Sequence, residues 1–534
     1  MHESHESTAC GLTSIQTLGN LLAAKGLLTR TANLPADPVA VCGAACDSRA
    51  VQPGHLFVCK GAHFDVRYLQ AALEAGACGY LCDTTLAQRL ADEAPSVPAL
   101  ITSDVRSAMA LVSAEAWGHP DQRMHVAGIT GTKGKTTVAY FVRSILDRGK
   151  PGSRAASIGT LETYDGVERF ASRNTTPEAP DLWRHLANAA NSGLDMVMEV
   201  SSQGLKYQRV EGLAYDVAAF LNIGVDHVSP IEHPTFDDYL SSKLKIFSNA
   251  RVALLNAQLD PAHAEQIEQA ASACAQTLHF LACEKAGQDA PKAEFLATNI
   301  RAQNGGMSFV AHTPQWSAPV QIALSGDFNV ENAIAAIAIA QTMGCTQEEI
   351  VRGLATASVP GRMDVIRGAD DHLTAIVDYA HNGMSVRQVL SSVRASYPTH
   401  RIIAVFGATG GKGAERRFEM PPAAAPYADH LIFTEDDAGP EPVERICAQM
   451  AEATPKGTAH EIVLDRTQAI THAVAMAKSG ESPCVVCVLG KGSETRQLRA
   501  DGPVPMTPDT ELVRALLGAQ SLTPNKTEGA ADGI

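Results

Sequence analysis

Hydrophobic residues gather in short runs along most of the chain, and helical patterns lie between the runs. Alternation of this kind predicts parallel β-sheets with helices on both faces. The predicted strands in the middle of the chain are Val126–Ile129, Met196–Val200, Val217–Ile223 and Val252–Asn256. Those of the last third are Ala375–Asp378, Ile402–Gly407, His430–Phe433 and Val485–Leu489. Helices are expected over Val138–Leu146 and from Phe236 onward.

Turn-rich junctions divide this α/β pattern into three blocks. A small α/β domain is expected over residues 1–122, a central domain over 123–359 and a C-terminal domain over 360–520, followed by a disordered polar tail at 521–534. A length of 534 residues is too great for one hydrophobic core. Residues 284–316 are irregular and predict β-hairpins, with a turn at Asn304–Gly306.

The composition excludes several classes of protein. Although 45% of the residues are hydrophobic, no stretch approaches the run of about 18 apolar residues that a membrane helix needs, so we expect no membrane insertion. The net charge of −15 argues against nucleic acid as a partner, because non-specific binding to it needs clustered lysine and arginine. Residues 1–7 are polar and do not resemble a signal peptide. The 12 cysteines are therefore expected to be reduced thiols, with Cys484 and Cys487 in the core.

The segment from Val126 to Val138 carries the clearest chemistry. An apolar strand enters Thr130-Gly131-Thr132-Lys133-Gly134-Lys135-Thr136-Thr137, and a helical pattern follows. Glycines let backbone N–H groups close around phosphate oxygens, and the helix N-terminus adds a partial positive charge. Lys135 is placed to reach the β- and γ-phosphates, and the Thr136 hydroxyl to ligate Mg²⁺. Because Ile129 takes the place of the usual first glycine, the motif indicates a nucleotide triphosphate site of a variant class.

Further polar residues follow the predicted strands. Ligands of open parallel sheets sit at the carboxyl ends of the strands, so Glu199 is suited to hold Mg²⁺ facing Thr136. Asp226 and His227 follow the next strand at the same edge, although a lone histidine is more often structural. Thr176 is placed either to cap a helix that has Pro177 in its first turn or to contact a ligand. Other polar or glycine-rich positions at helix starts, junctions and strand ends are Asn329, Asn332, Arg362, Asp378, Gly407–Gly413 and Gly490–Glu494.

Taken together, these motifs resemble those of the Mur ligases, ATP-dependent amide-forming enzymes that build the peptidoglycan stem peptide. The motifs that carry the resemblance are Thr130–Thr137, Asn174–Glu178, Met198–Ser202, Asp226–His227, Asn329–Asn332, Pro360–Arg362 and Asp378–His381. Asp47–Arg49, Asn174–Glu178 and Gly490–Glu494 are most similar to the branch that adds the third residue to UDP-N-acetylmuramoyl-L-alanyl-D-glutamate. The resemblance implies a central P-loop parallel-sheet ATPase domain flanked by a UDP-binding N-terminal domain and a Rossmann-like, amino-acid-binding C-terminal domain.

The resemblance also implies a role for each matching residue. Catalytic roles fall to Lys135, Lys243 and His227, and Lys243 aligns with a lysine that these enzymes carry as a carbamate (N6-carboxylysine). The implied metal ligands are Thr136, Glu199, His227 and the Lys243 carbamate. The implied ATP contacts are Gly131, Thr132, Lys133, Gly134, Lys135, Thr136, Thr137, Asn332, Arg362 and Asp378. The implied contacts to the UDP-muramoyl dipeptide are Ser48, Thr175, Thr176, Ser201 and Arg209.

The implied reaction is the ATP-driven joining of an amine to the D-glutamate side-chain carboxylate through an acyl phosphate. ATP and Mg²⁺ are the implied cofactors, and UDP-N-acetylmuramoyl-L-alanyl-D-glutamate and a free amino acid are the implied partners. Closure of the C-terminal domain is expected to exclude water from the acyl phosphate. The resemblance further implies a bacterial, cytoplasmic monomer that serves cell-wall synthesis.

The added amino acid is expected to be recognised in the C-terminal domain. Relatives that add meso-diaminopimelate carry Asp-Asn-Pro-Arg, whose arginine clamps the distal carboxylate. Here the stretch is Asp436-Asp437-Ala438-Gly439, and Lys412 takes the place of a second arginine. Two carboxylates suit a cationic side chain, so L-lysine is favoured, while ornithine and meso-diaminopimelate stay open. The predicted contacts to the amino acid are Asp436, Asp437, Gly490 and Glu494.

Three other classes stay open as alternatives. A folate-glutamate ligase of the same family would lack the UDP-binding domain that carries Asp47–Arg49. A P-loop kinase or motor ATPase would turn over ATP without a dipeptide and would not need the loop at Gly490. A non-catalytic paralogue is disfavoured by Lys135, Thr136 and Glu199, together with His227.

Overall fold

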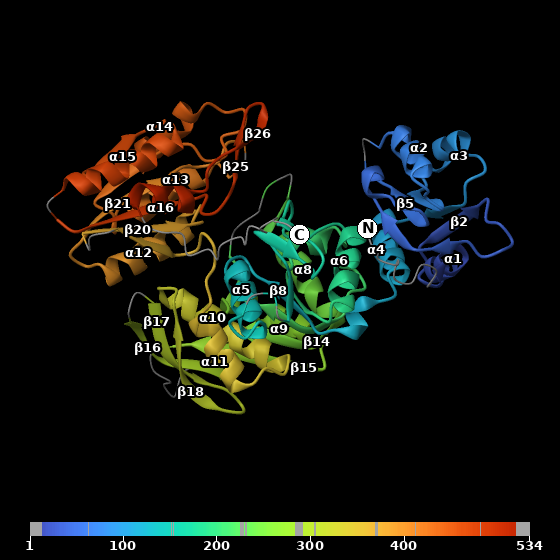
Figure 1. The fold of residues 1–534 in the computed structure, drawn as a ribbon, viewed down its shortest axis with the longest axis horizontal. Helices are drawn as coiled ribbons and strands as arrows, with labels where there is room; N and C mark the ends of the chain where they lie inside the picture. The colour runs from blue at the N-terminus through green and yellow to red at the C-terminus, as the bar shows by residue number, and fades with distance from the viewer. Residues whose placement is uncertain are drawn as a thin grey trace, which may run out of the picture. The chain divides into compact units, whose positions relative to one another are not determined.

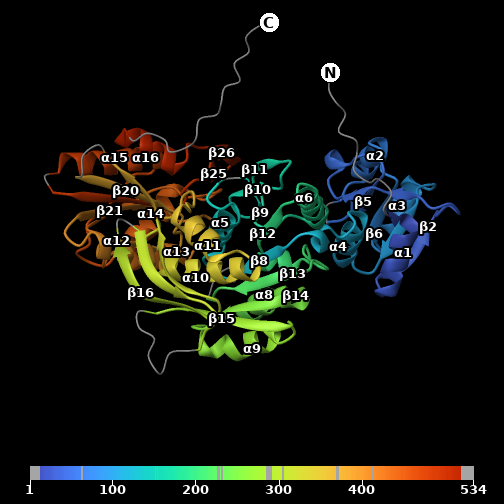
Figure 2. The same ribbon diagram turned by 60° about the horizontal axis from the view of Figure 1, so that its bottom comes forward.

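The described residues form an α/β fold with three large β-sheets, each covered by its own helices (Figures 1 and 2). The computed structural model describes residues 13–61, 64–150, 152, 154–224, 229, 232–283, 292–303, 306–368, 372–411, 413–480 and 482–518. Two compact units contain them: one spans 1–300, 309–321 and 330–357, and the other spans 301–308, 322–329 and 358–534. The three sheets agree with the three-domain α/β prediction. The exact domain boundaries stay predictions, and the predicted tail at 521–534 lies outside the described residues.

The first sheet, drawn in blue in Figure 1, has the strand order β2-β7-β6-β5-β4. These strands are β2 (Leu28–Ala32), β4 (Gly43–Ala45), β5 (His55–Cys59), β6 (Gly79–Asp83) and β7 (Ala99–Thr102), with only β2 antiparallel to its neighbour. Alternate strand residues enter different cores. Leu56 packs with helices α1 (Ile15–Ala24) and α4 (Val105–Ala116), whereas Phe57 packs with α2 (Val66–Glu74) and α3 (Ala87–Glu93).

The central sheet has eleven strands in the order β11-β10-β9-β12-β8-β13-β14-β15-β16-β17-β18. Its bounds are β8 (Val126–Thr130), β9 (Ala155–Ile158), β10 (Glu162–Tyr164), β11 (Arg169–Ala171), β12 (Asp195–Glu199), β13 (Tyr215–Phe220), β14 (Ala250–Asn256), β15 (Gln276–Ala282), β16 (Phe295–Gln303), β17 (Gly306–His312) and β18 (Ser317–Ile322). Strands β9, β12, β8, β13, β14, β15 and β16 are parallel, which confirms the predicted parallel sheet.

The edge of the central sheet departs from the all-parallel expectation. Strands β10 and β11 pair antiparallel, β10 with both β9 and β11. Only three residues connect β9 to β10, and a connection that short permits an antiparallel pair alone. The expected hairpins at 284–316 correspond to β16, β17 and β18, although Asn304 and Gly305 lie outside the described residues.

Helices of the first unit join its two sheets through one core. This core contains Leu18 of α1, Met109 of α4 and Trp183 of α6 (Ala179–Asn191), together with Val126 of β8 and Met198 of β12. The other helices of this part are α5 (Lys135–Leu146), α7 (Ser202–Lys206), α8 (Phe236–Leu244), α9 (Pro261–Ala271), α10 (Asp327–Thr342) and α11 (Gln347–Ala355). A continuous apolar core explains why the first two predicted domains form one compact unit.

The last sheet has the strand order β19-β20-β24-β21-β22-β23. Its strands are β19 (Asp364–Arg367), β20 (Leu373–Asp378), β21 (Arg401–Phe406), β22 (His430–Phe433), β23 (His460–Ile462) and β24 (Cys484–Leu489), and all but β19 run parallel. Val485 packs with α12 (Gly383–Ser396), α13 (Arg416–Ala424) and α14 (Val443–Glu452), and Val486 packs with α15 (Arg466–Ser479) and α16 (Asp509–Leu517). Both faces are therefore covered, as predicted. The hairpin β25 (Arg496–Arg499) and β26 (Gly502–Pro505) follows β24.

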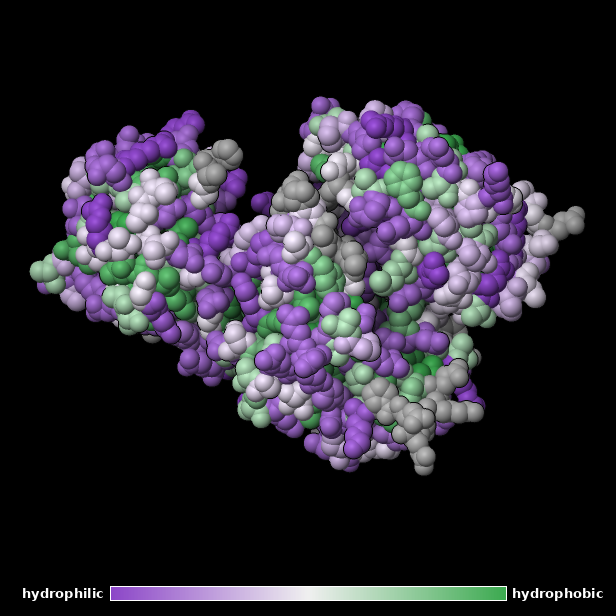
Figure 3. All heavy atoms as spheres, turned by 180° about the vertical axis from the view of Figure 1, so that it is seen from behind, coloured by the Kyte–Doolittle hydropathy of each residue, from purple (hydrophilic) through white to green (hydrophobic). Residues whose placement is uncertain are grey.

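The surface and the thiols bear on two further expectations. No helix among the described residues combines the length and apolar character that crossing a membrane requires. On the face shown in Figure 3, hydrophilic residues surround scattered hydrophobic ones.

Cys484 and Cys487 are buried, which confirms their core assignment. Cys42 is disulfide-bonded, so the expectation of reduced thiols throughout is wrong at this residue; a disulfide depends on spatial proximity, which sequence spacing does not reveal.

Candidate active site

The phosphate loop lies between β8 and α5, as the sequence predicts. Gly131 and Gly134 have positive φ angles of 149° and 87°. A side chain at Gly134 would also collide with Asn332, because a Cβ built there lies 2.4 Å from the Asn332 Oδ1 atom. Gly134 precedes α5 without a side-chain cap, so the first N–H groups of the helix face the loop. Asn332, which lies inside α10, is thus placed against the phosphate loop.

Two lysine side chains meet at one carbonyl of this loop. The Lys135 ammonium donates to the Gly131 oxygen at 2.8 Å and to the Thr132 oxygen at 3.3 Å. The Lys243 ammonium, on α8, donates to the same Gly131 oxygen at 2.9 Å. Lys243 is only 1% exposed, and its ammonium lies 4.8 Å from the centre of the Tyr239 ring. Burial of a lysine beside a phosphate loop distinguishes Lys243 from a surface lysine, and no local sequence pattern reveals it.

Thr136 and Glu199 form the predicted pair at the carboxyl edge of the sheet. The Thr136 hydroxyl donates to the Glu199 Oε2 atom at 2.9 Å, and Glu199 is 1% exposed. Sequence analysis missed Thr160, whose amide and hydroxyl donate to the two Glu199 carboxylate oxygens at 2.8 and 3.0 Å. A Cβ at Gly159 would lie 2.5 Å from Glu199 Oε1, so the glycine allows this close approach. Hard oxygen donors of this kind fit Mg²⁺. His227, the other predicted ligand, lies outside the described residues.

Thr176 does not cap a helix, so the capping alternative is wrong. Helix α6 begins after Glu178, with no side-chain cap and with Pro180 rather than Pro177 in its first turn. The Thr176 hydroxyl instead donates to the Glu199 main-chain oxygen at 3.0 Å and accepts from the Ser201 amide at 3.0 Å. The main chain at the carboxyl end of β12 thus binds the Thr176 hydroxyl, which is then not available to cap α6. Thr175 lies nearby, 3.1 Å from Thr160 between hydroxyl oxygens.

Arg209 lies in an ionic cluster beside Thr176. Its Nη1 atom donates to the Thr176 oxygen at 2.9 Å, and its Nε atom lies 2.9 Å from Glu178 Oε1. Lys60, from the end of β5, lies 3.0 Å from Glu178 Oε2. Burial alone would raise the pKa of Glu178, but Lys60 and Arg209 together lower it below its ordinary value. No local pattern points to Lys60, because its partner Glu178 is distant along the chain. Ser48 begins a short 3₁₀ helix, Ser48–Ala50, that Asp47 caps.

The predicted nucleotide contacts of the second unit are Arg362, which lies just before β19, and Asp378, at the end of β20. Asp378 ends β20 and accepts hydrogen bonds from the amides of Met363 and Ala380, both at 2.8 Å. Burial raises the pKa of Asp378, while Arg362 acts in the opposite direction. The Arg362 guanidinium lies 4.3 Å from the centre of the Tyr379 ring.

The predicted amino-acid contacts gather around a lysine that sequence analysis did not single out. Lys491 is 2% exposed, and its ammonium lies 2.9 Å from Asp437 Oδ1 and 2.5 Å from Glu494 Oε2. A Cβ at Gly490 would lie 2.4 Å from Asp436 Oδ2, so the glycine lets this carboxylate approach the loop. Burial raises the pKa of Asp436 to about 6, although Arg466 and Lys491 oppose this shift. Lys412 lies outside the described residues.

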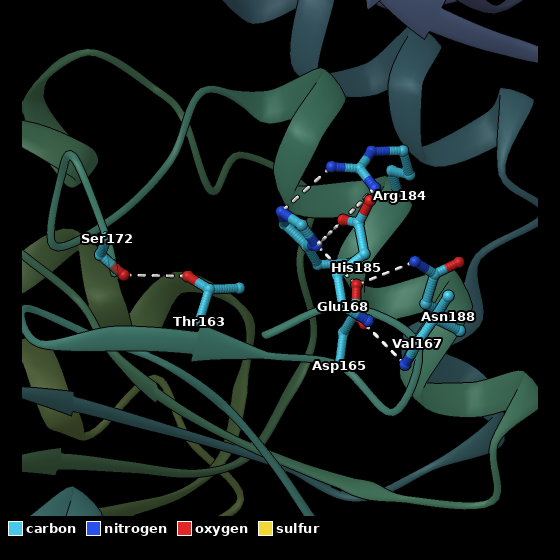
Figure 4. Close-up of polar contacts among 8 residues, drawn as sticks. All are labelled: Thr163, Asp165, Val167, Glu168, Ser172, Arg184, His185 and Asn188. Carbon is cyan, nitrogen blue, oxygen red and sulfur yellow. Dashed lines mark hydrogen bonds and ion pairs between the residues drawn. The ribbon is translucent and has the colours of Figure 1, made fainter. Parts of the chain in front are cut away.

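A separate cluster, Asp165, Glu168 and His185, has ligand atoms close enough to hold a metal ion (Figure 4). Figure 4 shows these side chains pointing toward one another, with Arg184 and Asn188 beside them. Asp165 Oδ2 already faces His185 Nδ1 at 2.6 Å and Asn188 Nδ2 at 2.8 Å, and Glu168 pairs with Arg184 at 2.6 Å. The acceptor oxygens thus have protein donors, and the cluster ties the β10–β11 hairpin to α6.

The fold and the site define a nucleotide-binding protein of the P-loop class, with a second domain that carries buried carboxylates. A Mur ligase middle domain model matches residues 129–340, and a Mur ligase glutamate ligase domain model matches residues 361–492. The chain is 37% identical over 483 residues to a UDP-N-acetylmuramyl-tripeptide synthetase of Bifidobacterium longum, covering 89% of this chain and 92% of that protein. The chain belongs to the Mur ligase family.

Other relatives agree in sequence and in fold. The chain is 34% identical to the UDP-N-acetylmuramoyl-L-alanyl-D-glutamate–L-lysine ligase of Enterococcus faecalis, covering 89% of this chain and 91% of that one. A solved UDP-N-acetylmuramoyl-L-alanyl-D-glutamate–2,6-diaminopimelate ligase is similar with a TM-score of 0.60 and 26% identity, over 90% of this chain and 95% of that one. The Mur ligase of Thermotoga maritima solved with ADP has a TM-score of 0.58 and 18% identity, over 84% and 93% of the two chains.

Proposed function

We propose that this chain is the ATP-dependent ligase that adds L-lysine to UDP-N-acetylmuramoyl-L-alanyl-D-glutamate during peptidoglycan synthesis in the bacterial cytoplasm. The observation that carries the proposal is the convergence of the Lys135 and Lys243 ammonium groups on Gly131, beside the Thr136–Glu199 pair. Cations and a metal-binding carboxylate at a phosphate loop suit transfer of a phosphoryl group. The E. faecalis relative, named as an L-lysine ligase, supports the substrate assignment.

The residues of the site account for activation of a carboxylate. A carboxylate does not react with an amine at neutral pH, because its oxygen is a poor leaving group. In the proposed reaction the D-glutamate side-chain oxygen attacks the γ-phosphorus of ATP, ADP leaves, and an acyl phosphate forms. Lys135 and the amides at the start of α5 stabilise negative charge on the transferring group. The amine of the added amino acid then attacks the acyl carbon, and inorganic phosphate leaves with its oxygen.

Thr136 and Glu199 fit a magnesium ion by their chemistry, since both offer oxygen and lie 2.9 Å apart. A bound Mg²⁺ would neutralise charge on the phosphates during transfer. Thr160 would hold the Glu199 carboxylate in place through its amide and hydroxyl. A carbamate on Lys243 would supply a further anionic oxygen ligand, as the family resemblance implies.

Thr176, Ser201 and Arg209 are the proposed contacts to the dipeptide portion. The three residues are mutually fixed, because Thr176 bonds Ser201 and Arg209 donates to the Thr176 oxygen. The Glu178 carboxylate pairs with the Nε side of Arg209, and this contact orients the guanidinium. A guanidinium held in this way suits a substrate carboxylate or phosphate.

The negative charge of the carboxylates in the second domain favours L-lysine as the added amino acid. Asp436, Asp437 and Glu494 gather around Lys491, and Arg466 also acts on Asp436. The predicted arginine clamp for a distal carboxylate is replaced by Gly439. An excess of carboxylates favours an amino acid with a cationic side chain and disfavours diaminopimelate.

The test is amide formation with the purified full-length chain, UDP-muramoyl dipeptide, ATP and Mg²⁺, with each amino acid in turn. We expect product with L-lysine at a kcat/KM at least about tenfold above that for ornithine or meso-diaminopimelate, a difference of roughly 1.4 kcal/mol. ADP and phosphate should form in equal amounts with the amide. A preference for diaminopimelate would overturn the L-lysine assignment, and ATP turnover that ignores the dipeptide would overturn the ligase.

A further inference from the structure

His233 is buried between α7, which follows β12, and α8, which contains Lys243. It is 0% exposed. Its Nδ1 atom lies 2.6 Å from Asp238 Oδ2, and its Nε2 atom lies 3.0 Å from the Ser202 hydroxyl. Lys206 and His233 lower the pKa of Asp238, so this carboxylate is ionised near neutral pH and accepts the Nδ1 proton. The imidazole therefore bridges α7, where Ser202 is the first residue, and α8, which contains Asp238.

The α8 side of this bridge leads to the phosphate loop. Asp238 is followed by Tyr239, whose hydroxyl lies 3.1 Å from the Thr132 hydroxyl. One turn later Lys243 donates to the Gly131 oxygen at 2.9 Å. Residues four apart share a helix face, so Tyr239 and Lys243 contact the phosphate loop from the same side of α8. The His233 ring packs edge-on against the Tyr239 ring, with centroids 5.2 Å apart. The position of His233 is thereby coupled to the face of α8 that meets the loop.

The α7 side leads to the Glu199 strand end. Ser201 caps α7, with its hydroxyl accepting from the Gly204 amide at 3.0 Å, and the Ser201 amide bonds Thr176. At the far end of α7, the Lys206 ammonium donates to Asp238 at 2.7 Å and to the Glu232 oxygen at 2.9 Å. Two links thus join α7 to the Asp238 carboxylate: one through His233 and one through Lys206.

We propose that His233 is a positioning residue of the ligase, which fixes Tyr239 and Lys243 against the phosphate loop at the correct distance from Glu199. This inference rests on the proposed function, since it concerns the same site. The physical reason is that α8, which carries Lys243, is linked to α7 through the bonds of Asp238 to His233 and Lys206. A small shift of α8 would move the Lys243 amine away from the reacting phosphate, and a displacement of about 1 Å can cost about 100-fold in rate.

The line Ser202–His233–Asp238 also has the order of atoms found in serine hydrolases. Ser202 is 5% exposed, and its hydroxyl faces the buried imidazole. Enclosure of the hydroxyl favours the positioning role over nucleophilic attack on a substrate. A hydrolytic role is kept as an outcome of the test, because covalent labelling of Ser202 by a fluorophosphonate would detect it.

The test compares His233→Leu with His185→Leu. His185 is the matched control: it is 2% exposed, its Nδ1 atom lies 2.6 Å from Asp165, and it belongs to α6 rather than to α8. Both variants lose a buried histidine–aspartate pair. We expect His233→Leu to lower kcat by about 100-fold with the KM for L-lysine changed by less than about threefold, and His185→Leu to keep kcat within about threefold of the native value.

Three further measurements keep the proposal testable if His233→Leu folds poorly. Ser202→Ala and His233→Asn each remove one bond of the bridge, and we expect smaller losses of kcat from each. Amide hydrogen exchange should rise in α8 and in residues 131–134 for the His233 variants but not for His185→Leu. The positioning role would be overturned by a native kcat in His233→Leu or by an equal loss of kcat in His185→Leu. Unchanged amide exchange in α8, or labelling of Ser202, would overturn it as well. Failure of the native protein to form any amide would overturn the proposed function alone, since the exchange measurement does not depend on it.

Discussion

The Lys491 ammonium lies 2.9 Å from the Asp437 carboxylate, and it also pairs with Glu494. Burial lowers the pKa of Lys491, but Asp436, Glu494 and Asp437 outweigh that effect and raise it. The chain thus supplies its own cation to the carboxylates that are predicted to receive an amino acid. Lys491 thereby holds the Asp437 and Glu494 side chains close together.

Removal of this cation should weaken the amino-acid site. In Lys491→Met, Asp437 and Glu494 would repel each other and spread apart, so we expect the KM for L-lysine to rise about tenfold, or roughly 1.4 kcal/mol. The KM for the UDP-muramoyl dipeptide should stay unchanged. Steady-state kinetics with each substrate varied in turn measures both values. Lys478→Met, which removes an exposed ammonium bonded only to the Leu516 main chain in the described contacts, is the control; an equal effect there would contradict the interpretation.

Loss of charge at Glu199 should weaken Mg²⁺ binding. Glu199→Gln keeps the size of the side chain and one oxygen but removes the negative charge that faces Thr136. We expect the Mg²⁺ concentration for half-maximal activity to rise about 10- to 100-fold. A Mg²⁺ titration of initial rates tests this, with Glu168→Gln as a carboxylate control away from the phosphate loop. An unchanged titration in Glu199→Gln would exclude a metal-ligand role.

Lys243 should be needed for turnover rather than for folding. Lys243→Ala removes the amine from Gly131, and we expect kcat to fall about 100-fold or more with little change in the KM for L-lysine. A carbamate on the native residue would give a carbon signal by NMR after incubation with labelled bicarbonate, and the variant would lack it. Full activity of Lys243→Ala would remove this residue from the mechanism.

The affinity for the amino acid should depend on pH through Asp436. Because burial raises the pKa of Asp436 to about 6, the side chain is neutral below that pH and anionic above it. A carboxylate that attracts a cationic amino acid must be ionised, so the KM for L-lysine should fall as the pH rises from 5 to 7, by about tenfold. Asp436→Asn should abolish that dependence. A KM profile that is the same in Asp436→Asn would assign the dependence to another group.

The Asp165 carboxylate should contribute stability that is lost in acid. Burial opposes its ionisation, but hydrogen bonds from His185, Asn188 and the Glu168 and Val167 amides lower its pKa from 3.8 to about 2. A group with a lowered pKa stabilises the fold above its unfolded value, and this contribution disappears as the pH falls from about 4 to about 2, by roughly 2 kcal/mol. Urea unfolding of the native protein and Asp165→Asn across that range tests it. A similar acid slope in both proteins would argue against the shift.

Strands and helices with regular periodicity were predictable from the sequence. Contacts in which a distant segment replaces the expected local partner of a side chain were not. The strand β14 ends at the predicted residue and the helix α8 begins at the predicted residue, because their apolar spacing reflects burial against one sheet. Thr176 failed as a helix cap because β12, distant in sequence, offers its hydroxyl a main-chain acceptor. Antiparallel β10 was missed because three residues of loop leave almost no composition signal.

Some of the residues predicted for the site lie together in the structure, but several of their partners were not predicted. Gly131, Thr136 and Glu199 lie together as expected, since a motif and a strand end determine them. Thr160 escaped notice because a lone threonine has no local pattern that reports burial. Lys491 lies inside the Gly490–Glu494 motif, but no role was assigned to it. Lys243 was found through the family resemblance, and the structure adds that its amine lies beside the loop.

The shared carbonyl of Gly131 gives a carbamate on Lys243 an electrostatic consequence. With both side chains unmodified, Lys135 and Lys243 bring two like charges to one oxygen. Uptake of a single CO₂ molecule by Lys243 would invert its sign from cation to anion. The repelling pair would then become an attracting one, with Lys135 as its counter-ion.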